Sequence, residues 1–143
     1  IGAIGNTTGR IVSGMLSDRI GRLNVLRLMV IVSAVAMPLL YLLGSNILAF
    51  SAGVFVVYYC YGTLLAVFAA ASADFYGTKH LGVNYGLLFL AWGISALVSA
   101  PLAGLMFDTF GDYRLAFFGA AMLSVISLLA LMATQNPSQK KAS

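Results

Sequence analysis

The sequence predicts an all-α membrane protein with five transmembrane helices. Of its 143 residues, 61% are hydrophobic and only 8% are charged, whereas soluble domains are about half apolar and about a quarter charged. Such a chain lacks the polar residues that would cover a soluble globule. Its apolar residues fall in runs close to the roughly 20 residues that a helix needs to cross a bilayer. The period-2 alternation of barrel strands does not occur in them.

Charges and turn residues separate the five predicted spans. The first runs from Ile1 to about Ser17, and we expect it to be truncated at its start, because neither Met nor a charged signal segment precedes it. The other four cover residues 25–43, 47–71, 85–107 and 114–133, joined by a turn at 44–46, a polar stretch at 72–84 and a turn at 108–113. Residues 1–133 are thus predicted to form part of a transmembrane bundle, and 134–143 a polar tail.

The basic residues predict how the spans are oriented. Cytoplasmic loops carry an excess of Lys and Arg, and the predicted connections divide into one basic side and one poor in bases. The basic side collects Arg19, Arg22, Arg27, Lys79, Lys140 and Lys141, and the opposite side has only Arg114. The sequence therefore predicts an integral protein of the plasma (inner) membrane with a cytoplasmic C-terminus. Because the bases lie in short loops and form no patch on a soluble face, nucleic acid is not an expected partner.

Arg10 is the only charged residue predicted to be buried deep within a span, since Arg27 and Arg114 stand at the ends of theirs. It precedes Asp18 by eight residues, which places it roughly 12 Å from the cytoplasmic end of its helix and close to the bilayer middle. An Arg there costs about 2.5 to 3.5 kcal/mol on insertion scales, so it indicates a functional site by default. Asn6, Ser13 and Ser17 recur at helical spacing around it, which predicts a single polar stripe.

A guanidinium in a wet cavity can hold a carboxylate through two parallel hydrogen bonds. The sequence leaves alternatives open: Arg10 could extend to the membrane interface or pair with an acid on another helix. All four Asp residues fall in predicted connections, which favours a substrate anion or a partner upstream. Other candidate substrate contacts are polar or aromatic residues of the first, third and fourth spans, and each could equally serve helix packing. They are Asn6, Ser13, Tyr58, Tyr61 and Trp92.

The residue inventory argues against an enzyme. The predicted spans contain no Asp pair, His cluster or Ser-His pair that could supply a reacting group. Cys60 is the only cysteine and lies in an apolar run, which excludes an internal disulfide and a multi-cysteine metal site. We therefore expect no cofactor, no metal and no catalytic residue.

The segment after Arg10 resembles the loop signature of the major facilitator superfamily, G-x-x-x-D-[RK]-x-G-[RK]-[RK]. The matching positions are Gly14, Asp18, Arg19, Gly21 and Arg22, and only the last basic position differs, as Leu23. Gly14 is expected to permit close helix packing. In that family the second copy of the signature joins helices eight and nine, so the resemblance implies that the five spans match helices 8–12 of a twelve-helix fold.

Two further segments look like the oxalate/formate antiporter and monocarboxylate transporter branch of this family. They are residues 73–86 and the Pro101–Gly104 segment followed by Asp108. In these relatives an Arg midway along helix eight contacts the substrate carboxylate, and Arg10 stands at the matching position. Oxalate carriers also have a Lys in helix eleven, where this chain has Trp92 and no cation nearby. A single buried cation suits a monoanion better than a dianion.

The resemblance implies a secondary active transporter that moves a small organic anion, a monocarboxylate such as lactate, pyruvate or formate, by alternating access. The expected partners are this anion, the lipid bilayer, an N-terminal half of the same protein and protons as a coupling ion. Symport and antiport both stay open. The alternatives are oxalate/formate exchange and a non-transporting sensor or scaffold on the same fold.

Overall fold

The computed structural model describes residues 1–134 and contains the five predicted helices. They are α1 (Gly2–Ile20), α2 (Arg22–Leu42), α3 (Ile47–Tyr76), α4 (Leu81–Phe110) and α5 (Arg114–Ala133). Helices α2 to α5 are each long and apolar enough to cross a membrane. α1 is not among these four, and its sequence is rich in Gly, Thr, Ser and Asn. The predicted tail, apart from Thr134, lies outside the described residues.

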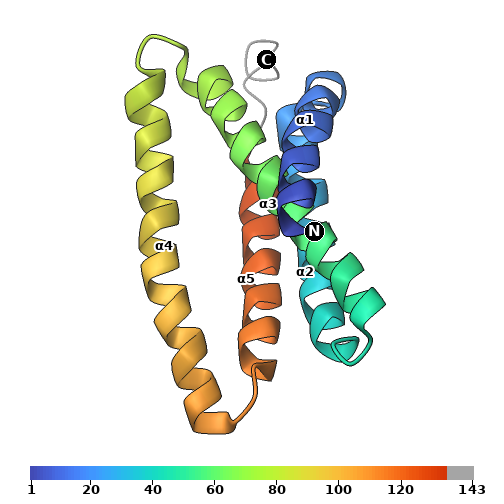
Figure 1. Ribbon diagram of the computed structural model, residues 1–143. Helices are drawn as coiled ribbons and strands as arrows, with labels where there is room; N and C mark the ends of the chain where they lie inside the picture. Colours follow the sequence, from blue (N-terminus) through green and yellow to red (C-terminus); the bar gives the residue numbers. More distant parts are fainter. Residues whose placement is uncertain (135–143) are drawn as a thin grey trace.

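Helix α3 occupies the centre of the arrangement and runs obliquely past its neighbours (Figure 1). It packs against α1, α2 and α4, while α5 packs against α2 and touches α4. Within residues 1–134, α1 makes no contact with α4. The α1–α2 and α3–α4 connections lie at the same end of the bundle, and the other two connections at the opposite end (Figure 1), as the predicted alternation of the loops requires.

The predicted helix ends need correction. The polar stretch at 72–84 was expected to be a connection, but α3 continues to Tyr76 and α4 already begins at Leu81. Asp18, Asp74 and Asp108 therefore lie in the last turns of helices, and the expectation that every Asp falls in a connection was wrong. Polarity marks where a helix leaves the bilayer, whereas a helix ends only where its hydrogen bonding stops. A 30-residue helix is about 45 Å long, more than the roughly 30 Å hydrocarbon core.

Helices α1 and α3 pack with their backbones nearly touching. A Cβ on Gly5 would lie 2.6 Å from the carbonyl oxygen of Phe55, and one on Gly9 would overlap that of Tyr59. From the opposite side, a Cβ on Gly62 would overlap the carbonyl oxygen of Asn6. Because lipid gives helices no hydrophobic reason to associate, small residues that allow this approach are a main source of packing energy.

The apolar core lies between α2 and α3. Leu23, Val25, Leu26 and Met29 of α2 are buried together with three residues of α3, which are Cys60, Val67 and Ala71. Leu16 of α1 packs against the edge of this cluster. The core thus holds α2 against one face of α3 and leaves other faces of α3 for α1 and α4.

Candidate functional site

The side chain of Arg10 is exposed in this structure and is held by its own helix. Its Nε donates a hydrogen bond to Oδ1 of Asn6, one turn earlier, at 2.9 Å. All ion pairs found among residues 1–134 involve Arg22, so Arg10 has no carboxylate partner there. The terminal nitrogens Nη1 and Nη2 of Arg10 donate no hydrogen bond within that part of the chain. The contact to Asn6 therefore orients the guanidinium. It leaves the two terminal nitrogens able to donate a pair of parallel hydrogen bonds.

Ser13 does not share the environment of Arg10. It is fully buried, donates to the hydroxyl of Tyr59 at 2.9 Å and accepts from Thr63 at 2.9 Å. The expected single polar stripe is therefore wrong. Residues four positions apart are offset by about 40° around a helix, so a row of them turns slowly about the helix axis. The buried residues of α1 form such a row, which consists of Gly5, Gly9, Ser13 and Ser17. Arg10 lies next to this row and is not part of it. The Ser13–Tyr59–Thr63 network, which the sequence did not reveal, satisfies the polar groups between α1 and α3.

Aromatic side chains of α3 and α4 form a continuous row whose first member touches α1. The ring of Tyr58 lies against Gly2, 3.2 Å from where a Cβ would stand. Ring centroids are 6.5 Å apart for Tyr58 and Tyr61, and 6.4 Å apart for Tyr61 and Trp92. Phe89 then continues the row along α4, 5.7 Å from Trp92. Three residues predicted as substrate contacts, Tyr58, Tyr61 and Trp92, are thus brought together.

Arg10 lies on a side of α1 that does not face the core. Leu16 faces the core on the α2 side, and Arg10 is six residues away, which is about 120° around the helix. Cys60 and Val67 are buried on the face of α3 that packs against α2. Tyr61 lies on the face of α3 toward α4. Arg10 therefore points away from the core that α2 forms with α3.

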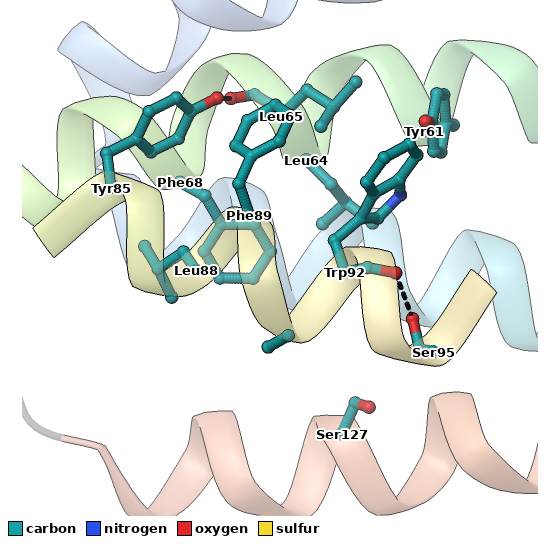
Figure 2. A pocket seen from close by; sticks show the side chains of 11 residues that line it. Tyr61, Leu64, Leu65, Phe68, Tyr85, Leu88, Phe89, Trp92, Ser95 and Ser127 are labelled. Carbon is teal, nitrogen blue, oxygen red and sulfur yellow. Dashed lines mark hydrogen bonds between the residues drawn. The ribbon is translucent and has the colours of Figure 1, made fainter. Parts of the chain in front are cut away.

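A cavity of about 480 Å³ opens between α3 and α4 at the end of the aromatic row. Figure 2 shows Tyr85, Phe89 and Trp92 projecting from α4 toward α3, while Ser127 lies on α5 at the other side of α4 in this view. The residues that line it, apart from alanine and serine, are Tyr61, Leu64, Leu65, Phe68, Tyr85, Leu88, Phe89 and Trp92. The site thus combines one fixed cation with an aromatic cavity, and no cluster of metal ligands occurs in residues 1–134.

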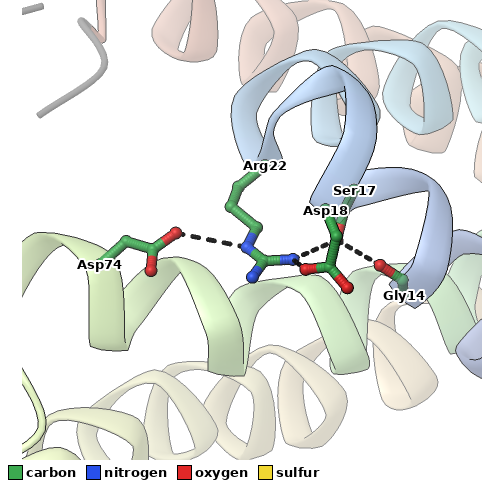
Figure 3. A network of polar contacts seen from close by, with 5 residues as sticks. All are labelled: Gly14, Ser17, Asp18, Arg22 and Asp74. Carbon is green, nitrogen blue, oxygen red and sulfur yellow. Dashed lines mark hydrogen bonds and ion pairs between the residues drawn. The ribbon is translucent and has the colours of Figure 1, made fainter. Parts of the chain in front are cut away.

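The loop signature forms a polar cluster at the end of the bundle that was predicted to be cytoplasmic. Gly21 joins α1 to α2 with φ +92 and ψ 146, a backbone conformation that favours glycine. This turn brings Arg22 back toward α1, where it pairs with Asp18 and donates to Oγ of Ser17 at 2.6 Å. It also donates to Oδ2 of Asp74 on α3 at 3.2 Å (Figure 3). Arg22 therefore ties three helices together.

Two expectations about this signature change. Gly14 was expected to permit close helix approach, but a Cβ there would meet nothing within 4 Å in this structure. The close approach belongs to Gly5 and Gly9 instead. Asp74, which a sequence reading places in a loop, faces Arg22 from a helix 52 residues away. Because 52 positions separate Arg22 from Asp74, no local sequence pattern predicts that they form a pair.

Removing the Arg22 side chain is expected to destabilise the protein by about 1 to 2 kcal/mol, because three partly exposed polar contacts are lost together. Arg22→Ala should lower the midpoint of thermal unfolding in detergent. Arg19→Ala is the matched control, because Arg19 is exposed and forms no ion pair within residues 1–134. Equal losses in the two variants would show that general loop charge, rather than the Arg22 cluster, stabilises this end.

Two further contacts fix helix ends. Arg27 of α2 donates to the carbonyl oxygens of Leu131 and Thr134, at 2.9 and 3.0 Å, where the last carbonyls of α5 have no helical partner. At the opposite end, the hydroxyl of Tyr41 donates to Oδ2 of Asp112 at 2.6 Å. The contacts of Arg27 and of Tyr41 each join residues more than 70 positions apart. The sequence predicted neither of them. They hold α5 and the α4–α5 turn against α2.

Comparison with known proteins agrees with this architecture. The family model described as Major Facilitator Superfamily matches residues 1–143. The uncharacterized MFS-type transporter YhjX of Escherichia coli (strain K12) is 34% identical over 95 residues, which is 66% of this chain and 24% of that protein. Human monocarboxylate transporter 14 is 27% identical over 91% of this chain and 26% of its own length. The oxalate:formate antiporter of Oxalobacter formigenes is 27% identical over 80% of this chain and 27% of its own length.

No solved structure matches the chain significantly. The chain spans about a quarter of the length of these relatives. The family model covers the whole sequence, the five helices have the expected order, and the loop signature lies between the first two of them. The chain therefore belongs to the Major Facilitator Superfamily of transporters.

Proposed function

We propose that this chain forms part of the substrate path of a secondary transporter for a small organic anion, a monocarboxylate, and that Arg10 binds the carboxylate. The observation that carries the proposal is the state of Arg10: its Nε is fixed by Asn6 at 2.9 Å, and it has no acidic partner within residues 1–134. An intramembrane cation without a protein counter-charge is costly. A substrate anion would supply that charge.

The surroundings of Arg10 suit a transported anion. The guanidinium is exposed on α1, and the aromatic row formed by Tyr58, Tyr61 and Trp92 begins against Gly2 of the same helix. Relatives named as monocarboxylate transporters and as an oxalate:formate antiporter support an organic anion. Alternating access would move it as the two halves of the complete protein rock around the site.

The proposal includes the predicted topology, in which the C-terminus and the Arg22 cluster face the cytoplasm of a plasma (inner) membrane, and protons are the coupling ion. The bases Arg19, Arg22 and Lys79 lie at the end of the bundle that holds the α1–α2 and α3–α4 connections (Figure 1). This arrangement supports the orientation through the excess of basic residues in cytoplasmic loops.

Transport can be tested with proteoliposomes that contain the complete gene product carrying this chain. We expect saturable uptake of labelled pyruvate that lactate inhibits. Lactamide, which has the same shape without the charge, should inhibit at least about tenfold less well, because it cannot form charge-assisted bonds with Arg10. Competition by formate and oxalate would separate a monocarboxylate carrier from an oxalate/formate exchanger. Folded protein with no flux of any of these acids would support the sensor or scaffold alternative.

A further inference from the structure

The cavity between α3 and α4 has a chemistry that Arg10 alone does not explain. Five aromatic residues lie on its walls, and no charged residue does. Of its hydroxyl groups, Tyr85 donates to the carbonyl of Leu65 at 3.2 Å, and Ser95 donates to that of Trp92 at 2.8 Å. Ser127 donates to the carbonyl of Leu123 at 2.9 Å. The backbone thus occupies these three donors.

The remaining donors of the cavity, the hydroxyl of Tyr61 and the indole N–H of Trp92, carry no charge, so a second ionised group has no counter-ion among the lining residues. Burying an unpaired carboxylate costs far more than burying an apolar group of the same size. Aromatic walls favour a flat, apolar ligand, because paired aromatic rings gain more binding energy than the burial of their apolar surface alone provides. The cavity therefore provides no counter-ion for the second charge of a dianion and favours an apolar group.

Adjacent residues of α3 link the cavity wall to the Asn6–Arg10 pair. Tyr61 is part of its wall and also belongs to the aromatic row that leads back toward α1. The next residue, Gly62, lies against the backbone of Asn6, and the side chain of Asn6 holds Arg10. In the binding mode that we infer, an anion on Arg10 would extend its other end past Tyr61 and against Trp92.

We propose that the cavity is a subsite for the apolar group of the substrate, and that the preferred substrate is a monocarboxylate with an aryl or branched apolar side chain. This inference rests on the proposed function and names its substrate class. A volume of about 480 Å³ lies within the range of about 300 to 1,000 Å³ for small-molecule pockets. A water molecule takes about 30 Å³ of liquid volume, so a three-carbon acid would leave most of this space unfilled.

Pyruvate and phenylpyruvate make the test, because they share the carboxylate and ketone and differ by one ring. In competition against labelled pyruvate in proteoliposomes of the complete protein, phenylpyruvate should bind about tenfold more tightly than pyruvate, from ring stacking and burial together. Oxalate, with its second charge, should compete more weakly than either acid.

Replacing Trp92 should remove this preference selectively. Trp92→Ala is expected to lower the affinity for phenylpyruvate about tenfold more than it lowers the affinity for pyruvate. Trp92→Phe keeps a ring and should retain most of the preference. Leu97→Ala is the matched control, because Leu97 lies on the same helix, is 77% exposed and does not line the cavity. Pyruvate uptake by each variant shows that it is folded.

The outcomes separate the subsite from the transport function. Equal affinity for both acids, or a preference that survives Trp92→Ala, overturns the subsite even while pyruvate is transported. If no acid is transported, thermal stabilisation of the purified protein provides the readout. Phenylpyruvate should then raise the unfolding midpoint more than pyruvate does, and this difference should disappear in Trp92→Ala. Such a result would support the subsite in a protein that does not transport. Equal or absent stabilisation would overturn it.

Discussion

Replacing Gly9 with leucine is expected to prevent α1 from docking on α3. A Cβ at this position would overlap the carbonyl oxygen of Tyr59 and lie 3.0 Å from its carbonyl carbon. These are backbone atoms of the central helix, so no side-chain rotation relieves the clash. Overpacking a core costs about 1 to 3 kcal/mol when side chains can adjust, and we expect at least about 3 kcal/mol here. That is a large part of the total stability of about 5 to 15 kcal/mol of a typical folded protein.

The measurement is the yield of monodisperse protein and its unfolding midpoint in detergent. Gly9→Leu should give little or no folded protein, because the Ser13–Tyr59–Thr63 bonds depend on the same approach of the two helices. Gly119→Leu makes the same chemical change in α5, where a Cβ would meet nothing within 4 Å, and should stay close to wild type. A Gly9→Leu protein as stable as this control would contradict the α1–α3 packing described above.

The number and order of the helices could be predicted from the sequence because composition records burial in lipid directly. Helix ends could not. The residues of 72–84 are polar because they leave the bilayer, and yet most of them continue α3 or begin α4. The same limit hid the pair of Arg22 with Asp74, which only the folding of α2 back along α3 brings to 3.2 Å.

The candidate site was predictable where a local signal exists. Asn6 and Arg10 stand one helical turn apart and interact directly, and a lone charge in an apolar run is visible in any reading of the sequence. Ser13 shows the limit: it fits the same spacing, but the winding of the α1–α3 contact buries it against Tyr59. Which residues of an amphipathic stripe face a partner depends on the crossing of two helices, and a single sequence does not contain that angle.

Arg10→Gln is expected to reduce kcat/KM for pyruvate uptake by about 100-fold or more. Hydrogen bonds to charged groups contribute about 1.5 to 3 kcal/mol each, and a carboxylate on the guanidinium fork would lose two of them. Glutamine keeps a polar side chain of intermediate length and removes only the charge and the fork. The initial rate of uptake into proteoliposomes at several pyruvate concentrations gives the value.

The loss should be specific to substrate binding rather than to folding. Arg10 is exposed and its side chain bonds only to Asn6 within residues 1–134, so the unfolding midpoint of Arg10→Gln should match that of wild type. Arg10→Lys keeps a positive charge but cannot form two parallel hydrogen bonds with a carboxylate. Its kcat/KM should lie between those of wild type and Arg10→Gln, about tenfold below wild type. Uptake by Arg10→Gln at the wild-type rate would show that a different residue balances the substrate's charge. The polar and aromatic flank of α1, α3 and α4 would then have to serve helix packing instead.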